Sequence, residues 1–219
     1  MATSGTAYLV QPDDGPGPGV LVLHSWWGLT RGVKDTVELL ADSGFTAMAP
    51  DLSGGLLPET ADEARSALVD SNPNVTADLV LSSLVTLRAH SVDPEAPVGA
   101  VGFAMGASWA LWAATRMPED IGAVVAYYGT QNLDFDDLTA PVLGHFAEED
   151  DLVSEDDKIE MHARLLLSEK SVELHDYKGT SHGFAEVNPS ARFDRVSAQL
   201  AWNRTITFLA MNLSLSKPL

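Results

Sequence analysis

The stretch VGAVGFAMGASW, residues 98–109, decides how this chain of 219 residues folds. It is typical of a buried strand that runs through Gly102 and Gly106 into a helix, the G-x-x-x-G arrangement of a nucleophile elbow. In such an elbow the central residue sits on a strained turn, and a Cβ on either glycine would collide with the neighbouring chain. The central residue here is Ala104, whose methyl group cannot attack a carbonyl. The pattern therefore predicts the turn without its nucleophile, although glycine-rich turns also occur as plain packing features.

Strand-sized apolar runs and helical patterns alternate on both sides of this turn. The run at residues 19–24 is apolar almost throughout, which is typical of a strand covered on both faces of a mostly parallel sheet. We therefore predict a single α/β domain over residues 1–219, with a doubly wound sheet and helices on both faces. Whether residues 56–73 form a lid stays open. Strands are expected at residues 6–11, 19–24, 45–49, 97–103, 123–128, 142–146 and 171–177, and helices at 33–43, 59–71, 75–90, 105–116, 158–169 and 192–212.

Composition limits the classes of partner. The chain has 31 acidic and 13 basic residues, a formal net charge of −18, so we expect its surface to repel nucleic acid and anionic lipid. It has no cysteine, which excludes disulfides and thiolate metal sites, and no apolar run long enough to cross a bilayer. Residues 1–5 lack the order of a signal peptide, so we expect a cytoplasmic protein, either monomer or homodimer.

No cofactor or metal is expected. The acidic run at residues 148–157 lacks the turn glycine and alternating ligands of a calcium loop. No phosphate-binding glycine loop is present, and the glycines of residues 99–106 do not have the spacing of a dinucleotide turn. The chemistry must therefore come from side chains and backbone amides.

Suggestive side chains follow the predicted strands, where sites gather in open parallel sheets. Ala104 follows the central strand, Asp150 follows the strand at 142–146, and His182 follows the strand at 171–177. An α/β-hydrolase triad has this same order along the chain, with the nucleophile first, then the acid, then the histidine. His182 would carry the proton, Asp150 would orient its ring, and the backbone N–H groups of Trp26 and Met105 would face a developing oxyanion.

The remaining site residues are expected to shape the pocket or support it. We assign Ser25, Trp27 and Phe184 to the substrate pocket. Trp109 and Trp112, at helical spacing, are expected in the core. Two further histidines at strand ends are expected to pack and hydrogen-bond beneath the site, namely His24 and His145.

With these residues placed, the chain resembles the dienelactone hydrolase family from about residue 24 to residue 210. The resemblance implies an α/β-hydrolase fold without a large cap, and hydrolysis of an ester or lactone through an acyl-enzyme. It also selects Asp150, rather than Asp151, as the acid, and Trp26 and Met105 as the oxyanion hole. The matching pieces are HSWWGL (24–29), APDL (49–52), VGFAMG (101–106), AYYG (126–129), LGHF (143–146) through Asp150, GTSHGF (179–184), NRT (203–205) and FL (208–209).

Three departures from the family pattern bear on activity and substrate. Ala104 stands at the cysteine or serine nucleophile, and Ser25 stands where prototype members place a glutamate that interacts with the cysteine. Gly55 and Glu186 match the two arginines that hold the lactone's carboxylate. Because a glutamate repels a substrate carboxylate, we expect an uncharged ester or lactone.

Two interpretations of Ala104 remain. We favour an engineered replacement of a serine or cysteine, which inactivates a hydrolase and leaves its surroundings intact, because a strained turn has little use without catalysis. The alternative is a natural non-catalytic protein that binds a small ligand in the same pocket. Restoring a nucleophile separates the two.

Overall fold

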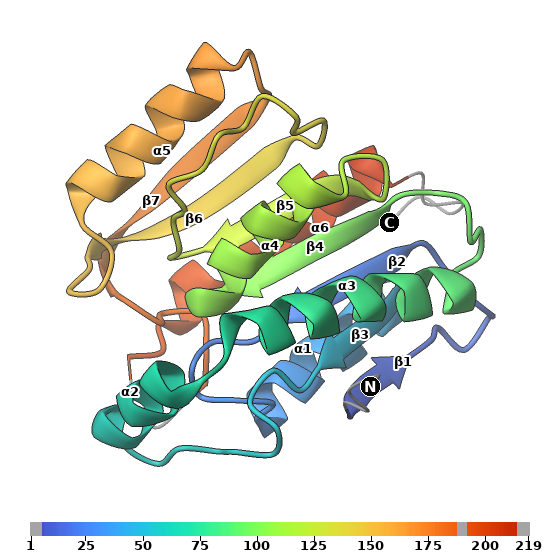
Figure 1. Cartoon of the computed structure of the whole chain (residues 1–219), viewed down its shortest axis with the longest axis horizontal. Helices are drawn as coiled ribbons and strands as arrows, with labels where there is room; N and C mark the ends of the chain where they lie inside the picture. The colour runs from blue at the N-terminus through green and yellow to red at the C-terminus, as the bar shows by residue number, and fades with distance from the viewer. Residues whose placement is uncertain (1–5, 188–191, 214–219) are drawn as a thin grey trace.

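The computed structural model describes residues 6–187 and 192–213, in which one sheet of seven strands is flanked by helices (Figure 1). The strand order is β1-β3-β2-β4-β5-β6-β7, and every neighbouring pair is parallel except β1 with β3. The predicted doubly wound, mostly parallel sheet is therefore confirmed. The strands are β1 (Ala7–Val10), β2 (Gly19–Leu23), β3 (Thr46–Pro50), β4 (Val98–Phe103), β5 (Ile121–Tyr127), β6 (Val142–Glu149) and β7 (Val172–Ser181).

Helices cover both faces of the sheet, as predicted. α3, α4 and α5 pack on one face and α1 and α6 on the other, and each face has its own buried cluster. α2 lies apart near one end of the sheet and buries only Ala64. The helices are α1 (Arg31–Asp42), α2 (Ala61–Asp70), α3 (Pro73–His90), α4 (Met105–Arg116), α5 (Glu155–Leu167) and α6 (Arg195–Asn212).

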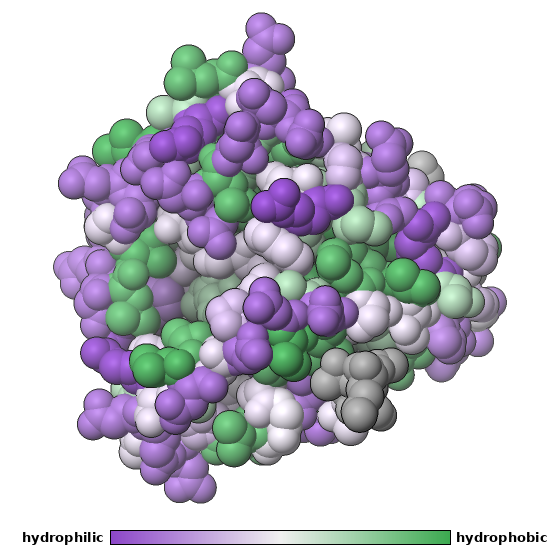
Figure 2. All heavy atoms as spheres, in the orientation of Figure 1, coloured by the Kyte–Doolittle hydropathy of each residue, from purple (hydrophilic) through white to green (hydrophobic). Residues whose placement is uncertain are grey.

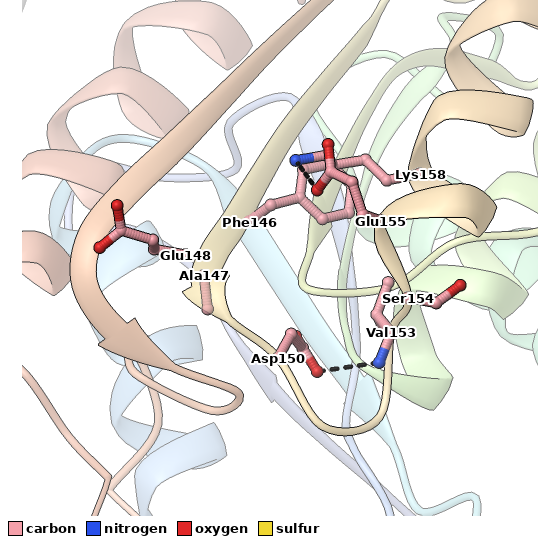
Figure 3. A pocket seen from close by; sticks show the side chains of 8 residues that line it. All are labelled: Phe146, Ala147, Glu148, Asp150, Val153, Ser154, Glu155 and Lys158. Carbon is pink, nitrogen blue, oxygen red and sulfur yellow. Dashed lines mark hydrogen bonds and ion pairs between the residues drawn. The ribbon is translucent and has the colours of Figure 1, made fainter.

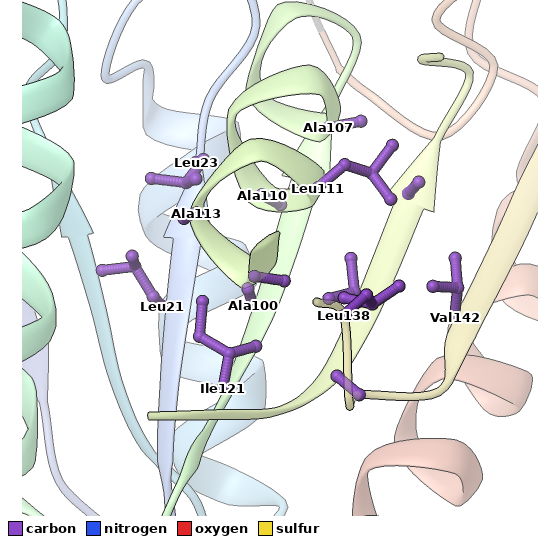
Figure 4. Close-up of a cluster of buried hydrophobic side chains, with 14 of the residues drawn as sticks. Leu21, Leu23, Ala100, Ala107, Ala110, Leu111, Ala113, Ile121, Leu138 and Val142 are labelled. Atoms are coloured by element: carbon purple, nitrogen blue, oxygen red, sulfur yellow. The ribbon is translucent and has the colours of Figure 1, made fainter. Parts of the chain in front are cut away.

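The centre of the sheet is buried on both sides. Every residue of β2 and β4 is buried, which explains why their sequences show no polar alternation. α4 turns four alanines toward the sheet, Ala107, Ala110, Ala113 and Ala114, so its backbone can approach β4 closely (Figure 4). This packing fixes the start of α4, and with it the turn that carries Ala104.

Several elements differ in their bounds from the expectation, and the differences at β6, β7 and α5 have a clear physical reason. β6 continues to Glu149 and β7 to Ser181, because the two strands stay paired beyond the apolar core, with Glu149 opposite Ser181. α5 begins at Glu155, three residues earlier than predicted, because the Ser154 side chain caps it by accepting from the Asp157 N–H. Polar strand ends and side-chain caps leave little trace in hydrophobic periodicity.

The chain reverses its direction of winding between β2 and β4. β3 lies on one side of β2 and β4 on the other, which makes a topological switch point at their carboxyl ends. Figure 2 shows a mostly polar face with a hollow between the α2 and α5 ends of the molecule and apolar residues along its margin. The site is therefore expected at this edge.

The sequence predicted neither a membrane-spanning segment nor a metal site. None of the helices in the described residues is both long and apolar enough to cross a bilayer. Within these same residues, no three His, Asp or Glu side chains are grouped to hold a metal ion. Residues 1–5, on which the expectation of no signal peptide depended, lie outside the described part.

Candidate active site

The turn between β4 and α4 has the geometry of a nucleophile elbow. Ala104 has φ 49° and ψ −113°, a conformation that side chains rarely adopt. A Cβ on Gly102 would lie 2.2 Å from the Gly106 carbonyl oxygen, and one on Gly106 would lie 2.0 Å from the Leu23 carbonyl oxygen. Both glycines are therefore required by close backbone approach, as predicted.

The residues after β5 support this elbow from the side. The Ala104 N–H donates to the Tyr127 carbonyl at 2.9 Å, and a Cβ on Gly129 would lie 2.5 Å from the Ala104 carbonyl oxygen. Tyr128, between them, also has a positive φ of 38°, and its ring packs edge-on against His182 at 5.0 Å between centroids. Tyr128 thus links the elbow to the histidine.

His182 and Asp150 form a hydrogen-bonded pair. Nδ1 of His182 lies 2.9 Å from each carboxylate oxygen of Asp150. Oδ1 of Asp150 also accepts from the Leu152 and Val153 N–H groups at 2.9 and 2.8 Å, and Figure 3 shows the bond to Val153 beside a small cavity. The exposed side-chain fractions are only 7% for Asp150 and 10% for His182. The carboxylate is therefore held by the loop before α5 and aimed at one ring nitrogen.

Asp151 has a different partner. Its carboxylate accepts two hydrogen bonds from Arg192, at 2.7 and 3.1 Å, and these bonds hold the pKa of Asp151 below its usual value. Asp150 is thus the carboxylate that contacts His182.

Two backbone amides at the switch point have no acceptor within residues 6–187 and 192–213. Among the described residues, neither the Trp26 N–H, after β2, nor the Met105 N–H, at the start of α4, donates to a protein acceptor. The positive end of α4 also favours negative charge here.

A buried histidine fixes the orientation of the first amide. Nε2 of His24 accepts from the Leu52 N–H at 2.9 Å, so Nδ1 carries the proton and donates to the Ser25 carbonyl oxygen at 2.7 Å. Because a trans peptide points its C=O and N–H in opposite directions, the Trp26 N–H is directed away from His24. Burial lowers the pKa of His24, which keeps the ring neutral as this arrangement requires.

A cavity of about 250 Å³ opens beside the histidine. Ser25, Trp26 and Trp27 form part of its wall, and Trp27 packs edge-on against Trp26. The other residues that line it are Glu59, Thr60, Ala61, Arg65, Asp151, Leu152, His182, Gly183, Glu186 and Arg192.

The structure places Phe184 beneath this cavity rather than in its wall. Its side chain is fully buried and packs against Tyr128 and Tyr177. The reason is a tight turn in which the Phe184 N–H donates to the Ser181 carbonyl and Gly183 has a φ of 86°. This turn directs the Phe184 ring into the core. The sequence pattern did not indicate that orientation.

Glu186 has an unexpected role in the site. Its carboxylate accepts from the Ser25 hydroxyl at 2.7 Å and from the Tyr128 hydroxyl at 3.0 Å, and burial raises its pKa. The sequence suggested only that its charge disfavours anionic substrates. Its two hydroxyl partners come from residues 58 and 161 positions away, so no local signal could have revealed them.

The other buried histidine lies beneath the site, as expected. His145 hydrogen-bonds through Nδ1 to the Tyr177 hydroxyl at 2.8 Å and through Nε2 to the Thr205 hydroxyl at 3.1 Å. Burial lowers its pKa to about 3, so it stays neutral and structural.

A doubly wound sheet, a strained elbow and an acid–histidine pair at the switch-point edge define an α/β-hydrolase. The profile of the dienelactone hydrolase family matches residues 6–213, and the chain belongs to that family.

Named relatives and a solved structure agree with this assignment. The chain is 30% identical over 210 residues to "Protein usf" of Aquifex pyrophilus, covering 92% of this chain and 90% of that protein. It is 27% identical over 224 residues to "Carboxymethylenebutenolidase 1" of Cupriavidus pinatubonensis, covering 94% and 91%. The crystal structure of a dienelactone hydrolase-like promiscuous phosphotriesterase, P91 from metagenomic libraries, superposes with a TM-score of 0.80 at 20% identity, covering 95% and 99%. At that identity the structural likeness supports the fold alone.

Proposed function

We propose that this chain has the active site of a carboxylic ester or lactone hydrolase, inactivated because Ala104 replaces a serine or cysteine. The observation that carries the proposal is the strained conformation of Ala104 beside an intact Asp150–His182 pair. A positive φ costs a non-glycine residue on the order of 1 kcal/mol or more, and catalysis is the usual reason to retain it.

Each group has a defined task once a hydroxyl or thiol stands at position 104. His182 takes the proton of that nucleophile as it attacks the ester carbonyl, and Asp150 stabilises the resulting imidazolium. The Trp26 and Met105 N–H groups stabilise the oxyanion. His182 then gives the proton to the departing alcohol, which leaves an acyl-enzyme that water hydrolyses by the same steps in reverse roles.

The substrate we propose is uncharged at the reacting end. The formal net charge of −18 and the carboxylate of Glu186 in the cavity wall both oppose an anionic group near the site. The relative named as a carboxymethylenebutenolidase supports lactone chemistry for the fold, and an uncharged lactone or ester fits this chain's wall better than a carboxylate-bearing one.

The deciding experiment compares the chain with Ala104→Ser and Ala104→Cys on short p-nitrophenyl esters and a panel of lactones. We expect activity in at least one variant, and a loss of about 10³-fold or more when His182→Ala or Asp150→Asn is added. The comparison must be between variants, because a site without its triad can still accelerate hydrolysis over water by about 10³-fold.

The second candidate is a natural binding protein, favoured by Ala104 itself. In that case both substituted chains fold and stay inert on every ester and lactone, while a small ligand binds the unsubstituted chain equally well. That result would reject the hydrolase proposal.

A further inference from the structure

A second and larger cavity lies under α2. It measures about 720 Å³, within the range of small-molecule pockets, whereas the cavity beside His182 measures about 250 Å³. Much of its wall is apolar, including Leu52, Leu56, Leu68, Val75, Met105 and Trp109.

The two cavities share wall residues next to the proposed oxyanion site. Ser25 and Trp26 line both of them, and Met105, which supplies the other free amide, lines the larger one. A carbonyl held by these amides would therefore have the large, mainly apolar cavity on one side and the small, more polar cavity on the other.

His182 distinguishes the two sides. It lines the small cavity and is not among the residues that line the large one. The leaving alcohol must receive its proton from His182, so the alcohol must lie in the small cavity. That cavity also carries the charged side chains Glu59, Arg65 and Arg192, which suit a small polar alcohol.

We propose, building on the proposed function, that the cavity under α2 is the acyl-binding site and takes an apolar acyl group of medium length. Esters or lactones with an apolar acyl chain and a small polar alcohol portion are then the substrate class.

The small side chains of α2 leave this space open. Ala64 and Ala67 line the cavity from α2, and a larger residue at either position would fill it. Trp109 lines it from α4 and, like Trp112, also packs against the core, as its helical spacing predicted. Apolar side chains at the margin are only partly covered, with exposed fractions of 41% for Leu68 and 44% for Val75. An apolar ligand that covers these side chains gains binding free energy, because apolar surface is removed from water.

A matched pair of substitutions on α2 tests the assignment in the Ala104→Ser chain. Ala67→Trp fills the cavity, whereas Ser66→Trp adds the same ring one residue away, at an exposed position that does not line it. Rates on p-nitrophenyl acetate, butyrate, hexanoate and octanoate are compared. We expect kcat/KM to rise about fourfold per buried methylene in the Ala104→Ser chain and in its Ser66→Trp variant. We expect Ala67→Trp to lower the octanoate-to-acetate ratio of kcat/KM at least tenfold.

Lengthening the alcohol instead of the acyl group tests the direction. Octyl acetate should gain nothing over ethyl acetate, because the small cavity cannot hold the chain. A rise along the alcohol series, or equal losses for acetate and octanoate in the Ala67→Trp variant, would overturn the assignment.

A binding measurement separates failure of the inference from failure of the proposed function. The neutral fluorophore N-phenyl-1-naphthylamine is titrated into the chain with Ala104 unchanged, and methyl decanoate is used to displace it. Displaceable binding that Ala67→Trp abolishes and Ser66→Trp retains supports an apolar ligand under α2, even if no restored nucleophile is active. Equal binding by both variants, or no binding to the unsubstituted chain, would reject the cavity as the acyl site.

Discussion

Glu186 shows how one side chain can set the charge that a site accepts. Its carboxylate is bonded to two neutral hydroxyls, those of Ser25 and Tyr128, and has no cation among the described residues within ion-pair distance. Burial raises its pKa because the charged form has lost solvent. A negative charge held in this way acts on any anionic group that enters the adjoining cavity.

Glu186→Gln should therefore relax discrimination against anionic esters. In the Ala104→Ser chain we expect the ratio of kcat/KM for a carboxylate-bearing ester to that for its neutral analogue to rise about tenfold. When Glu186 is kept, the same ratio should rise as pH falls toward the raised pKa of Glu186, because protonation removes its negative charge. Parallel kinetics on the two esters over a pH series provide the measurement.

Glu59→Gln is the matched control, because Glu59 lines the same cavity but is exposed. Its charge is screened by water, so we expect a much smaller effect. An equal effect of the two substitutions would show that overall charge, rather than the buried carboxylate, governs selectivity.

β4 and α4 are both closely packed, whereas the turn that joins them is strained. β4 is fully buried, and α4 rests on the sheet through its alanines. Ala104, between them, has a conformation that glycine adopts without cost. The packing on either side thus imposes the conformation of the junction.

Ala104→Gly should leave the protein as stable or stabilise it by up to about 1 kcal/mol, since it relieves the strain. Ala107→Gly, in the first turn of α4 and fully buried, should destabilise it by about 1 kcal/mol or more through lost helix propensity and packing. Urea unfolding of the two variants gives the free energies. If both substitutions destabilise equally, the turn is not strained in solution.

At the scale of the whole molecule, buried neutral histidines link stability to pH. His145 and His24 are both fully buried beneath the site, and burial lowers the pKa of each. A histidine with a lowered pKa in the folded state stabilises that state above its unfolded pKa of about 6.5, and the contribution is lost as pH falls below that value.

We expect His145 alone to remove about 2 kcal/mol from the free energy of unfolding between pH 7 and pH 5, given its folded pKa of about 3. In His145→Gln, the loss of unfolding free energy between pH 7 and pH 5 should be smaller by about 2 kcal/mol, even if the substitution lowers stability at pH 7. Denaturant unfolding at pH 7, 6 and 5 measures the change, and exposed His90→Gln is the control. An unchanged slope in His145→Gln would show that folding does not lower the pKa of this ring.

Much of the architecture could be predicted from local sequence, because it follows from local physics. Continuous apolar runs specify strands buried on both faces, and the glycines at 102 and 106 specify a turn where backbones nearly touch. Chain order suggested an acidic residue after the strand at 142–146 as the partner of His182, and the family resemblance selected Asp150 from that acidic run. The strand ends of β6 and β7 and the cap at Ser154 were less accessible, because polar pairing and capping do not follow hydrophobic period.

The class of sheet and the glycine turn could be predicted from local sequence patterns, and the roles of Asp150 and His182 stay predictions. Tertiary packing was needed to show which way Phe184 turns, which hydroxyls bind Glu186, how His24 orients the Trp26 amide, and that a cavity lies under α2. The difference has a physical reason. Strands, helices and tight turns depend on residues close together in the chain, whereas hydrogen bonds and cavities between distant segments depend on how the sheet brings those segments together.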